Sequence, residues 1–364
     1  MSALNPEQRA RENIDQLLAA AGWAVQSVSA ANLHAARGVA IREFPLEPGH
    51  GFADYLLYVD AKACGVIEAK KAGATLTGVE AQSARYAQGL PASLPAWHRP
   101  LPFAYESTGI ETHFTNGLDP APRARNVFAF HRPEMLAEWL SAVSYATRVS
   151  TRDDATAHST DFATQSFLTR LQRMPELVTE WGAGGSDFKL WPAQTVAIRN
   201  LEASLAQNKP RALIQMATGS GKTFTAIGFI YRLIKFAGAR RVLFLVDRAN
   251  LGRQAKKEFD AYVSPYNNYK FGEEYIVQHL QGNNLDTTAR VTISTIQRLF
   301  SMLKGRELAD EDDEHSTEEI ESLFKQPEPI AYNPKYPIET FDIIVTDEAH
   351  RIATRNPRET MGTE

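Results

Sequence analysis

Apolar and polar residues alternate along the chain in two different patterns. Up to about residue 147, the pattern predicts helices at 6–20 and 77–90 and strands at 38–47, 52–60, 64–71 and 125–131. From residue 186 onward, it predicts helices at 191–207, 222–236, 249–263 and 295–304, and apolar strands at 211–216, 241–246, 290–294 and 341–346. Helices that alternate with apolar strands are typical of a parallel sheet covered on both faces, so an α/β fold is predicted.

The stretch between these parts is rich in Ser, Thr, Ala and Asp, which is typical of a linker. The chain is therefore predicted to hold a first domain at 1–147, a linker at 148–185 and a second domain at 186–364. Residues 305–322 carry nine acidic residues and one arginine, and we expect them to form a solvated insertion.

Composition and charge narrow the class of protein. The hydrophobic share of 43% and the charged share of 23% are those of soluble globular proteins, and no apolar run could span a membrane. Cys64 is the single cysteine, so no internal disulfide can form, and a cytoplasmic location is expected. Residues 186–304 carry 17 Lys and Arg against 8 Asp and Glu. This surplus fits a polyanion such as DNA, or equally a surface of solvated lysines.

A glycine-rich loop follows the predicted strand at 211–216. The loop consists of Thr218, Gly219, Ser220 and Gly221. Glycine lets the loop amides point inward at phosphate oxygens, and the helix that starts next adds partial positive charge. Lys222 would then reach the β- and γ-phosphates of ATP, and the Thr223 hydroxyl would bind Mg²⁺.

Two acidic residues follow the predicted strand at 341–346 in the sequence Asp-Glu-Ala-His. At the carboxyl end of that strand, Asp347 would hold the Mg²⁺ of ATP through water, and Glu348 would orient and deprotonate the attacking water. The alternative is an acidic cap of the strand without catalytic function.

Two predicted strands near residue 60 bring acidic and basic residues together. If the strands pair as a hairpin centred on Ala61, Asp54 lies opposite Glu68, and Lys70 shares their face. Mg²⁺ between the two carboxylates would relieve their repulsion, and Lys70 could position the attacking water. The alternative is a surface hairpin with an ordinary ion pair.

The residues around this hairpin resemble the PD-(D/E)XK nucleases, which have a mixed sheet with flanking helices. Asp54 matches the Asp of the motif, and Glu68 and Lys70 match its E-x-K. The proline that often precedes the Asp is absent. Gln82 and Tyr86 match the Q-x-x-x-Y of one group of these nucleases, so the resemblance implies that they act at the site.

The second domain resembles the first RecA-like lobe of superfamily 2 helicases. By this resemblance Gln194 would read the adenine of ATP, and Arg248, Thr295 and Arg298 would contact the DNA backbone. For Gln194 and Arg248, helix capping or surface solvation is the alternative.

Together, the two resemblances match the domain order of the R subunit of type I restriction enzymes. They imply ATP-dependent translocation and cleavage of duplex DNA, with methyltransferase (M) and specificity (S) subunits as partners. Because a superfamily 2 motor needs a second lobe, a fragment that ends soon after Glu348 is expected to turn over little ATP. The alternatives are a stand-alone helicase–nuclease of defence or repair, and a truncated, non-catalytic DNA-binding remnant.

Overall fold

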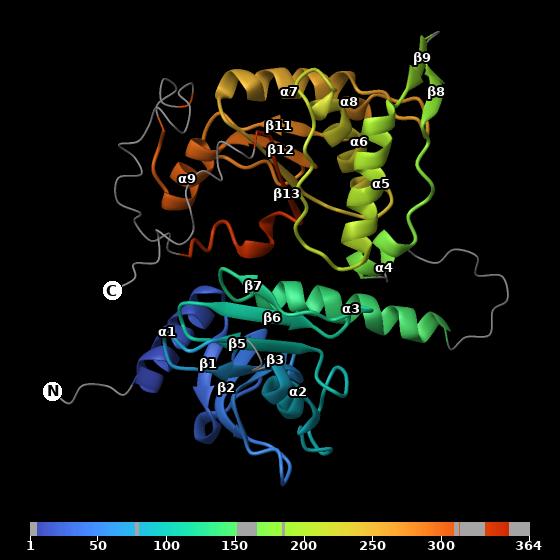
Figure 1. Cartoon of the computed structure of the whole chain (residues 1–364). Helices are drawn as coiled ribbons and strands as arrows, with labels where there is room; N and C mark the ends of the chain where they lie inside the picture. Colours follow the sequence, from blue (N-terminus) through green and yellow to red (C-terminus); the bar gives the residue numbers. More distant parts are fainter. Residues whose placement is uncertain are drawn as a thin grey trace. The chain divides into compact units, whose positions relative to one another are not determined.

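The computed structural model describes residues 6–76, 80–150, 166–183, 186–308, 313 and 332–348. By its internal contacts the chain divides into two compact units (Figure 1). The first unit comprises residues 1–169 and 332–339, and the second comprises 170–331 and 340–364. The boundary between residues 169 and 170 lies inside the predicted linker, whereas 332–339, which groups with the first unit, lies in the predicted second domain. Residues 151–165 of the linker and most of the acidic insertion lie outside the described residues.

The first unit is built on a seven-stranded mixed sheet, in agreement with the predicted fold class. Its strands lie in the order of the sequence: β1 (Ala24–Ser27), β2 (Gly38–Pro45), β3 (Phe52–Val59), β4 (Lys62–Ala69), β5 (Phe103–Ser107), β6 (Thr112–Asn116) and β7 (Arg125–Val127). The pairs β1–β2 and β4–β5 are parallel, and the other neighbours are antiparallel.

Helices cover both faces of this sheet (Figure 1). Ile14 of α1 (Pro6–Ala20) and Leu140 of α3 (Pro133–Ser150) pack in one apolar cluster with Tyr55 of the sheet. On the opposite face, Ala87 of α2 (Glu80–Gln88) packs with Val66. Burial of this kind stabilises the unit by roughly 25 cal/mol per Å² of apolar surface. The helix α2 connects the parallel strands β4 and β5, as a crossover must.

The β3–β4 hairpin turns tightly at Asp60 and Ala61. Both residues have positive φ values, 48° and 60°, and Val59 pairs directly with Lys62. This is the geometry of a two-residue turn, whose twist matches that of the flanking strands. The predicted hairpin, centred on Ala61, is therefore wrong at the turn.

A β-bulge at Cys64 restores the predicted register further along the hairpin. Cys64 has no partner in β3, and it shifts the pairing by one residue. Beyond the bulge Tyr55 lies opposite Ile67, so the next positions outward, Asp54 and Glu68, face each other as predicted. Without the extra residue Asp54 would face Ile67, and Glu68 would point to the other side of the sheet.

The second unit contains a parallel sheet, also as predicted. Its strand order is β11 (Val277–His279), β12 (Val291–Thr295), β10 (Val242–Val246) and β13 (Ile343–Thr346). The helices of this unit are α5 (Pro192–Ala206), α6 (Lys222–Lys235), α7 (Ala249–Ala261), α8 (Phe271–Glu274) and α9 (Ile296–Lys304). A hairpin of β8 (Glu180–Ala183) and β9 (Ser186–Lys189) precedes α5, and α4 (Phe167–Gln172) spans the boundary of the units. None of the described helices is both long and apolar enough to cross a bilayer.

The predicted strand at 211–216 is wrong. Residues 211–217 form no regular element, and the Leu213 side chain is 83% exposed. Within the described part of the chain β13 pairs with β10 alone, and Ile344 of β13 is 62% exposed. An apolar run forms a strand only where a neighbouring strand accepts its backbone hydrogen bonds, and this run has none among the described strands.

A buried histidine makes the stability of the first unit depend on pH. His131 is 8% exposed, its Nδ1 lies 2.8 Å from Tyr105 Oη, and burial lowers its pKa to about 3. The folded state therefore binds the proton less well than the unfolded state, whose histidine has a pKa near 6.5. The contribution of His131 to the stability of the first unit is fully present above pH ~6.5 and is lost as the pH falls toward ~3.

We expect the first unit to lose roughly 2 kcal/mol from this residue between pH 7.5 and pH 5. His131→Gln should lower stability at pH 7.5, because it disturbs the contact with Tyr105, but should reduce the further loss at pH 5. Denaturant unfolding of both proteins at the two pH values measures this difference. An equal loss in both would show that other groups cause the acid sensitivity.

Candidate nuclease and nucleotide sites

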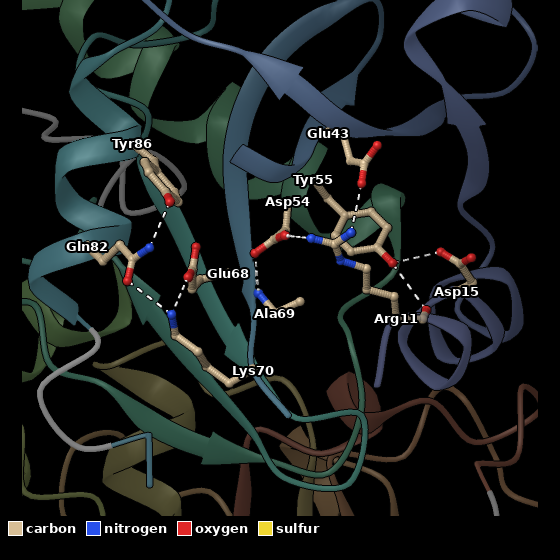
Figure 2. Close-up of polar contacts among 10 residues, drawn as sticks. All are labelled: Arg11, Asp15, Glu43, Asp54, Tyr55, Glu68, Ala69, Lys70, Gln82 and Tyr86. Atoms are coloured by element: carbon tan, nitrogen blue, oxygen red, sulfur yellow. Dashed lines mark hydrogen bonds and ion pairs between the residues drawn. The ribbon is translucent and has the colours of Figure 1, made fainter. Parts of the chain in front are cut away.

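Two carboxylates meet at the end of the β3–β4 hairpin that is remote from its turn (Figure 2). Asp54 Oδ2 accepts a hydrogen bond of 2.8 Å from the Ala69 backbone N–H, which fixes the Asp54 side chain against β4. Glu68 is 2% exposed. Burial is the largest cause that raises the pKa of Glu68, and the nearby charge of Asp54 raises it further. The bulged hairpin thus brings together the two predicted metal ligands.

A chain of hydrogen bonds joins Glu68 to helix α2 (Figure 2). Lys70 Nζ lies 2.5 Å from Glu68 Oε1 and donates to Gln82 Oε1 at 3.1 Å. Gln82 Nε2 in turn donates to Tyr86 Oη at 2.7 Å. All three residues were selected from the sequence, and their side chains are brought together with Glu68. The carboxylate counteracts the effect of burial, so the pKa of Lys70 is raised and the amine stays charged.

The donor set suits a hard divalent cation only in part. Carboxylate oxygens are the ligands that Mg²⁺ prefers, and Glu68 Oε2 is buried without a hydrogen-bond partner among the described residues. Within those same residues, no group of three or more His, Cys, Asp or Glu side chains is placed to hold a metal ion. Asp54 and Glu68 would therefore supply two ligands, and water or DNA oxygens would supply the others.

Three charged residues at this site were missed by the sequence analysis. Arg11 of α1 bonds to both Asp54 and Glu43 (Figure 2). Glu106 of β5 is fully buried and lies in register with Glu68 on the parallel strand. Arg11 and Glu106 are distant from the motif in sequence, so only the pairing of the strands and the packing of α1 could have revealed them.

The glycine-rich loop joins the acidic pair at the amino end of α6. Gly219 and Gly221 have φ values of 79° and 77°, which side chains rarely adopt, and Gly221 is the N-cap of the helix. Lys222 Nζ lies 2.5 Å from Glu348 Oε1. Asp347 comes directly after β13, and burial, followed by the charge of Glu348, raises its pKa. The two predicted halves of the ATP site are therefore adjacent.

Gln194 contacts this loop but also caps its own helix. Its Nε2 lies 3.3 Å from the Ser220 carbonyl oxygen, and its Oε1 accepts a bond of 2.9 Å from the Trp191 backbone N–H. Gln194 is 6% exposed. The geometry thus shows the helix-capping role that the sequence left open. Reading of adenine by Gln194 stays a prediction.

Two of the three predicted DNA contacts are engaged inside the second unit. Arg298 is 3% exposed and forms an ion pair with Asp313, at 2.9 Å from Nη2 to Oδ2. Thr295 is the N-cap of α9, is 1% exposed and donates its hydroxyl hydrogen to the same carboxylate. A buried ion pair keeps Arg298 from presenting its guanidinium to DNA, so this arrangement argues against the two predicted contacts. Arg248, the N-cap of α7, is about one-third exposed, with a side-chain value of 35%.

The second unit offers another basic surface beside α7. An open hollow of about 510 Å³ is lined by polar and basic side chains from α7 and from the segment around β11. The lining residues are Asn250, Arg253, Gln254, Lys256, Lys257, His279 and Gln281. We call this surface the α7 groove. None of its described lining residues is acidic, which fits contact with an anionic backbone.

Two family models match the chain. The first is described as the res subunit of type III restriction enzymes and matches residues 187–361. The second is described as the second domain of the type I restriction enzyme EcoKI endonuclease subunit and matches residues 7–111. The two matches include the residues of both the candidate nucleotide site and the candidate nuclease site.

Individual relatives agree with these models. The EcoKI endonuclease subunit of Escherichia coli K12 is 28% identical over 98% of this chain and 30% of its own length. The EcoAI endonuclease subunit of Escherichia coli is 28% identical over 49% of this chain and 18% of its own length. A solved fragment of a type I HsdR subunit from Vibrio vulnificus is 19% identical over 96% of this chain and 52% of its own. Its TM-score of 0.28 is too low to bear on the fold.

The chain spans less than one-third of the EcoKI subunit that it matches. The similarity nevertheless runs along almost the whole of this chain, through both units and both groups of motif residues. Over nearly its whole length the chain is therefore similar to the endonuclease (R) subunits of type I restriction enzymes.

Proposed function

We propose that this chain carries the DNA-cleaving site and the first ATP-binding lobe of a type I restriction enzyme R subunit. Residues 1–147 would form the nuclease domain and residues 186–364 the first lobe of the motor. Duplex DNA is the substrate, ATP and Mg²⁺ are the cofactors, and M and S subunits in the cytoplasm are the partners. The observation that carries the proposal is the continuous contact from Glu68 through Lys70 and Gln82 to Tyr86.

In the nuclease domain, Asp54 and Glu68 would hold Mg²⁺, which supplies a Lewis acid beside the scissile phosphate. The Glu68 carboxylate keeps Lys70 charged and Gln82 directs it, so Lys70 can orient the attacking water and stabilise charge on the phosphate. Tyr86 holds Gln82 in turn.

In the second unit, ATP would compete with Glu348 for Lys222. The loop of residues 218–221 would cradle the phosphates, while Thr223 and Asp347 would hold the Mg²⁺ that accompanies ATP. The contact between Lys222 and Glu348 must open before Lys222 can reach the β- and γ-phosphates. Glu348 is then released to orient the attacking water.

DNA would contact the second unit along the α7 groove, near Arg248. The burial of Thr295 and Arg298 makes them poor phosphate contacts, whereas Lys257 lines an open surface. These contacts are sequence-independent, because they reach only the phosphates.

Glu68→Gln tests the nuclease site. We expect the variant to lose Mn²⁺ binding and metal-dependent nicking of plasmid DNA, because a neutral amide is a poor metal ligand. In the wild type, Mn²⁺ affinity should fall as the pH drops through the raised pKa of Glu68. Calorimetric titration and gel analysis of plasmid measure both effects. Asp60→Asn, at the turn of the same hairpin, is the control.

The same variant should make the metal-free protein more stable. A raised pKa means that Glu68 contributes stability below the usual pKa of glutamate, and that this stability is lost as the pH rises through the raised value. Glutamine stays neutral, so Glu68→Gln should raise the Tm at pH 7.5.

Unchanged nicking by Glu68→Gln would remove Glu68 from the site. No nicking by the wild type would favour a non-catalytic DNA-binding protein.

Two substitutions with opposite effects test the nucleotide site. Lys222→Ala should abolish binding of ATP–Mg²⁺. Glu348→Gln should tighten it by a factor of about 1.4 to 5, since partly exposed ion pairs are worth roughly 0.2–1 kcal/mol. Titration with a fluorescent ATP analogue measures both. Weaker binding by Glu348→Gln would mean that Glu348 helps to hold the nucleotide rather than competing with it.

Salt dependence tests the DNA contact. Binding to duplex DNA should weaken steeply with salt, and Lys257→Ala should reduce the slope of log K against log salt concentration by about 1. Arg298→Ala should leave this slope unchanged and destabilise the second unit, because Asp313 would be left buried without its partner. Lys189→Ala, on the β8–β9 hairpin, is a control for the loss of one surface charge. A slope that responds to Arg298→Ala but not to Lys257→Ala would restore the sequence-based assignment.

A further inference from the structure

Arg11 occupies one side of the nuclease site. Its Nη2 lies 2.7 Å from Asp54 Oδ1, and its Nη1 lies 2.7 Å from Glu43 Oε1 (Figure 2). Its side chain is 38% exposed, whereas that of Asp54 is 15% exposed. A guanidinium that solvent can reach therefore bridges one predicted metal ligand and a more exposed carboxylate.

The position of Arg11 is fixed by the fold around it. Tyr55, the neighbour of Asp54 in β3, donates from Oη to the Arg11 carbonyl oxygen at 3.2 Å and to Asp15 Oδ1 at 2.8 Å. These bonds hold this turn of α1 against β3. Glu43 has a φ of 51° within β2, a conformation that is unfavourable for a side chain and that the surrounding strands must support.

The charges at the site are unbalanced without a metal. The site has four carboxylates, those of Asp54, Glu68, Glu43 and Glu106. Arg11 and Lys70 are the two cations that contact the first three of them. Lys70 contacts Glu68 from the α2 side, while Arg11 contacts Asp54 from the α1 side (Figure 2). A divalent cation that binds at Asp54 thus meets Arg11 as a competing positive charge.

We propose that Arg11 competes with the divalent metal for Asp54 and binds a DNA phosphate after the metal has bound. Neutralisation of Asp54 by the metal weakens the contact with Nη2, while Glu43 still holds Nη1 and keeps the guanidinium at the edge of the site. Arginine recognises phosphate through two parallel N–H donors, and the exposed fraction of Arg11 leaves it accessible. This inference rests on the proposed nuclease function.

The first arm of the test measures metal binding without DNA. Arg11→Ala should bind Mn²⁺ about threefold to tenfold more tightly than the wild type, because the competing charge is gone. Arg37→Ala is the matched control: Arg37 pairs with Asp60, at the turn of the same hairpin, and its loss should leave Mn²⁺ affinity unchanged. A residue that only orients Asp54 would give weaker metal binding when removed, and that result would overturn the proposal.

The second arm measures how much the metal strengthens DNA binding. The Kd for duplex DNA without Ca²⁺ is divided by the Kd at saturating Ca²⁺. The phosphate contacts of the second unit contribute to both values, so the ratio reports on the nuclease site. This ratio should fall about tenfold in Arg11→Ala, since a charged hydrogen bond is lost, and Arg11→Lys should recover part of it. Arg37→Ala should keep the wild-type ratio.

The outcomes separate this inference from the function on which it rests. No Mn²⁺ binding by the wild type would contradict the nuclease proposal itself. Mn²⁺ binding that is equal in the wild type and in Arg11→Ala would contradict the competition. A ratio that is unchanged in Arg11→Ala would contradict the contact with phosphate.

Discussion

The register of one hairpin determines whether the residues of the proposed nuclease site come together. Side chains on a strand alternate between two faces, so a shift of one residue between β3 and β4 would separate Asp54 from Glu68. The bulge at Cys64 sets that register, and the burial of Tyr55 and Ile67 in one apolar cluster stabilises it. The positions of Lys70, which follows β4, and of Gln82, which contacts Lys70, depend on the same pairing.

The two sites are in a comparable electrostatic state. In each site, a lysine contacts a carboxylate, and both side chains have a role in the same proposed reaction. The pairs are Lys70 with Glu68 and Lys222 with Glu348. In the proposed reaction the contact between Glu68 and Lys70 keeps the lysine charged, whereas the contact between Lys222 and Glu348 has to open before Lys222 can reach the phosphates. Of the four charged groups, the Glu68 carboxylate is the buried one, and its pairing with Lys70 compensates that burial.

Sequence alone predicted the parts of the structure that depend on local pattern. Strong periodicity or clear end signals predicted five elements that the structure contains: the helices α1, α6 and α7 and the strands β10 and β13. The opposition of Asp54 and Glu68 was also predicted, although the predicted turn was wrong: a two-residue turn and a bulge together give the same pairing as the symmetrical hairpin. The strands β5 and β6 and the helix α3 were not predicted. The strand at 211–216 was predicted in error, because pairing with a distant neighbour decides the outcome there. Arg11 reaches Asp54 from 43 residues away, and no local pattern encodes such a contact.

The burial of Arg298 against Asp313 restricts how the sequence of the second unit can vary. Loss of either partner alone leaves a charge in an environment where both side chains are about 5% exposed, and such a loss typically costs 3–5 kcal/mol. Replacement of both by apolar residues of similar volume avoids that cost. Among descendants of this sequence, the two positions should therefore change together, through a short-lived or compensated intermediate, although 15 residues separate them along the chain.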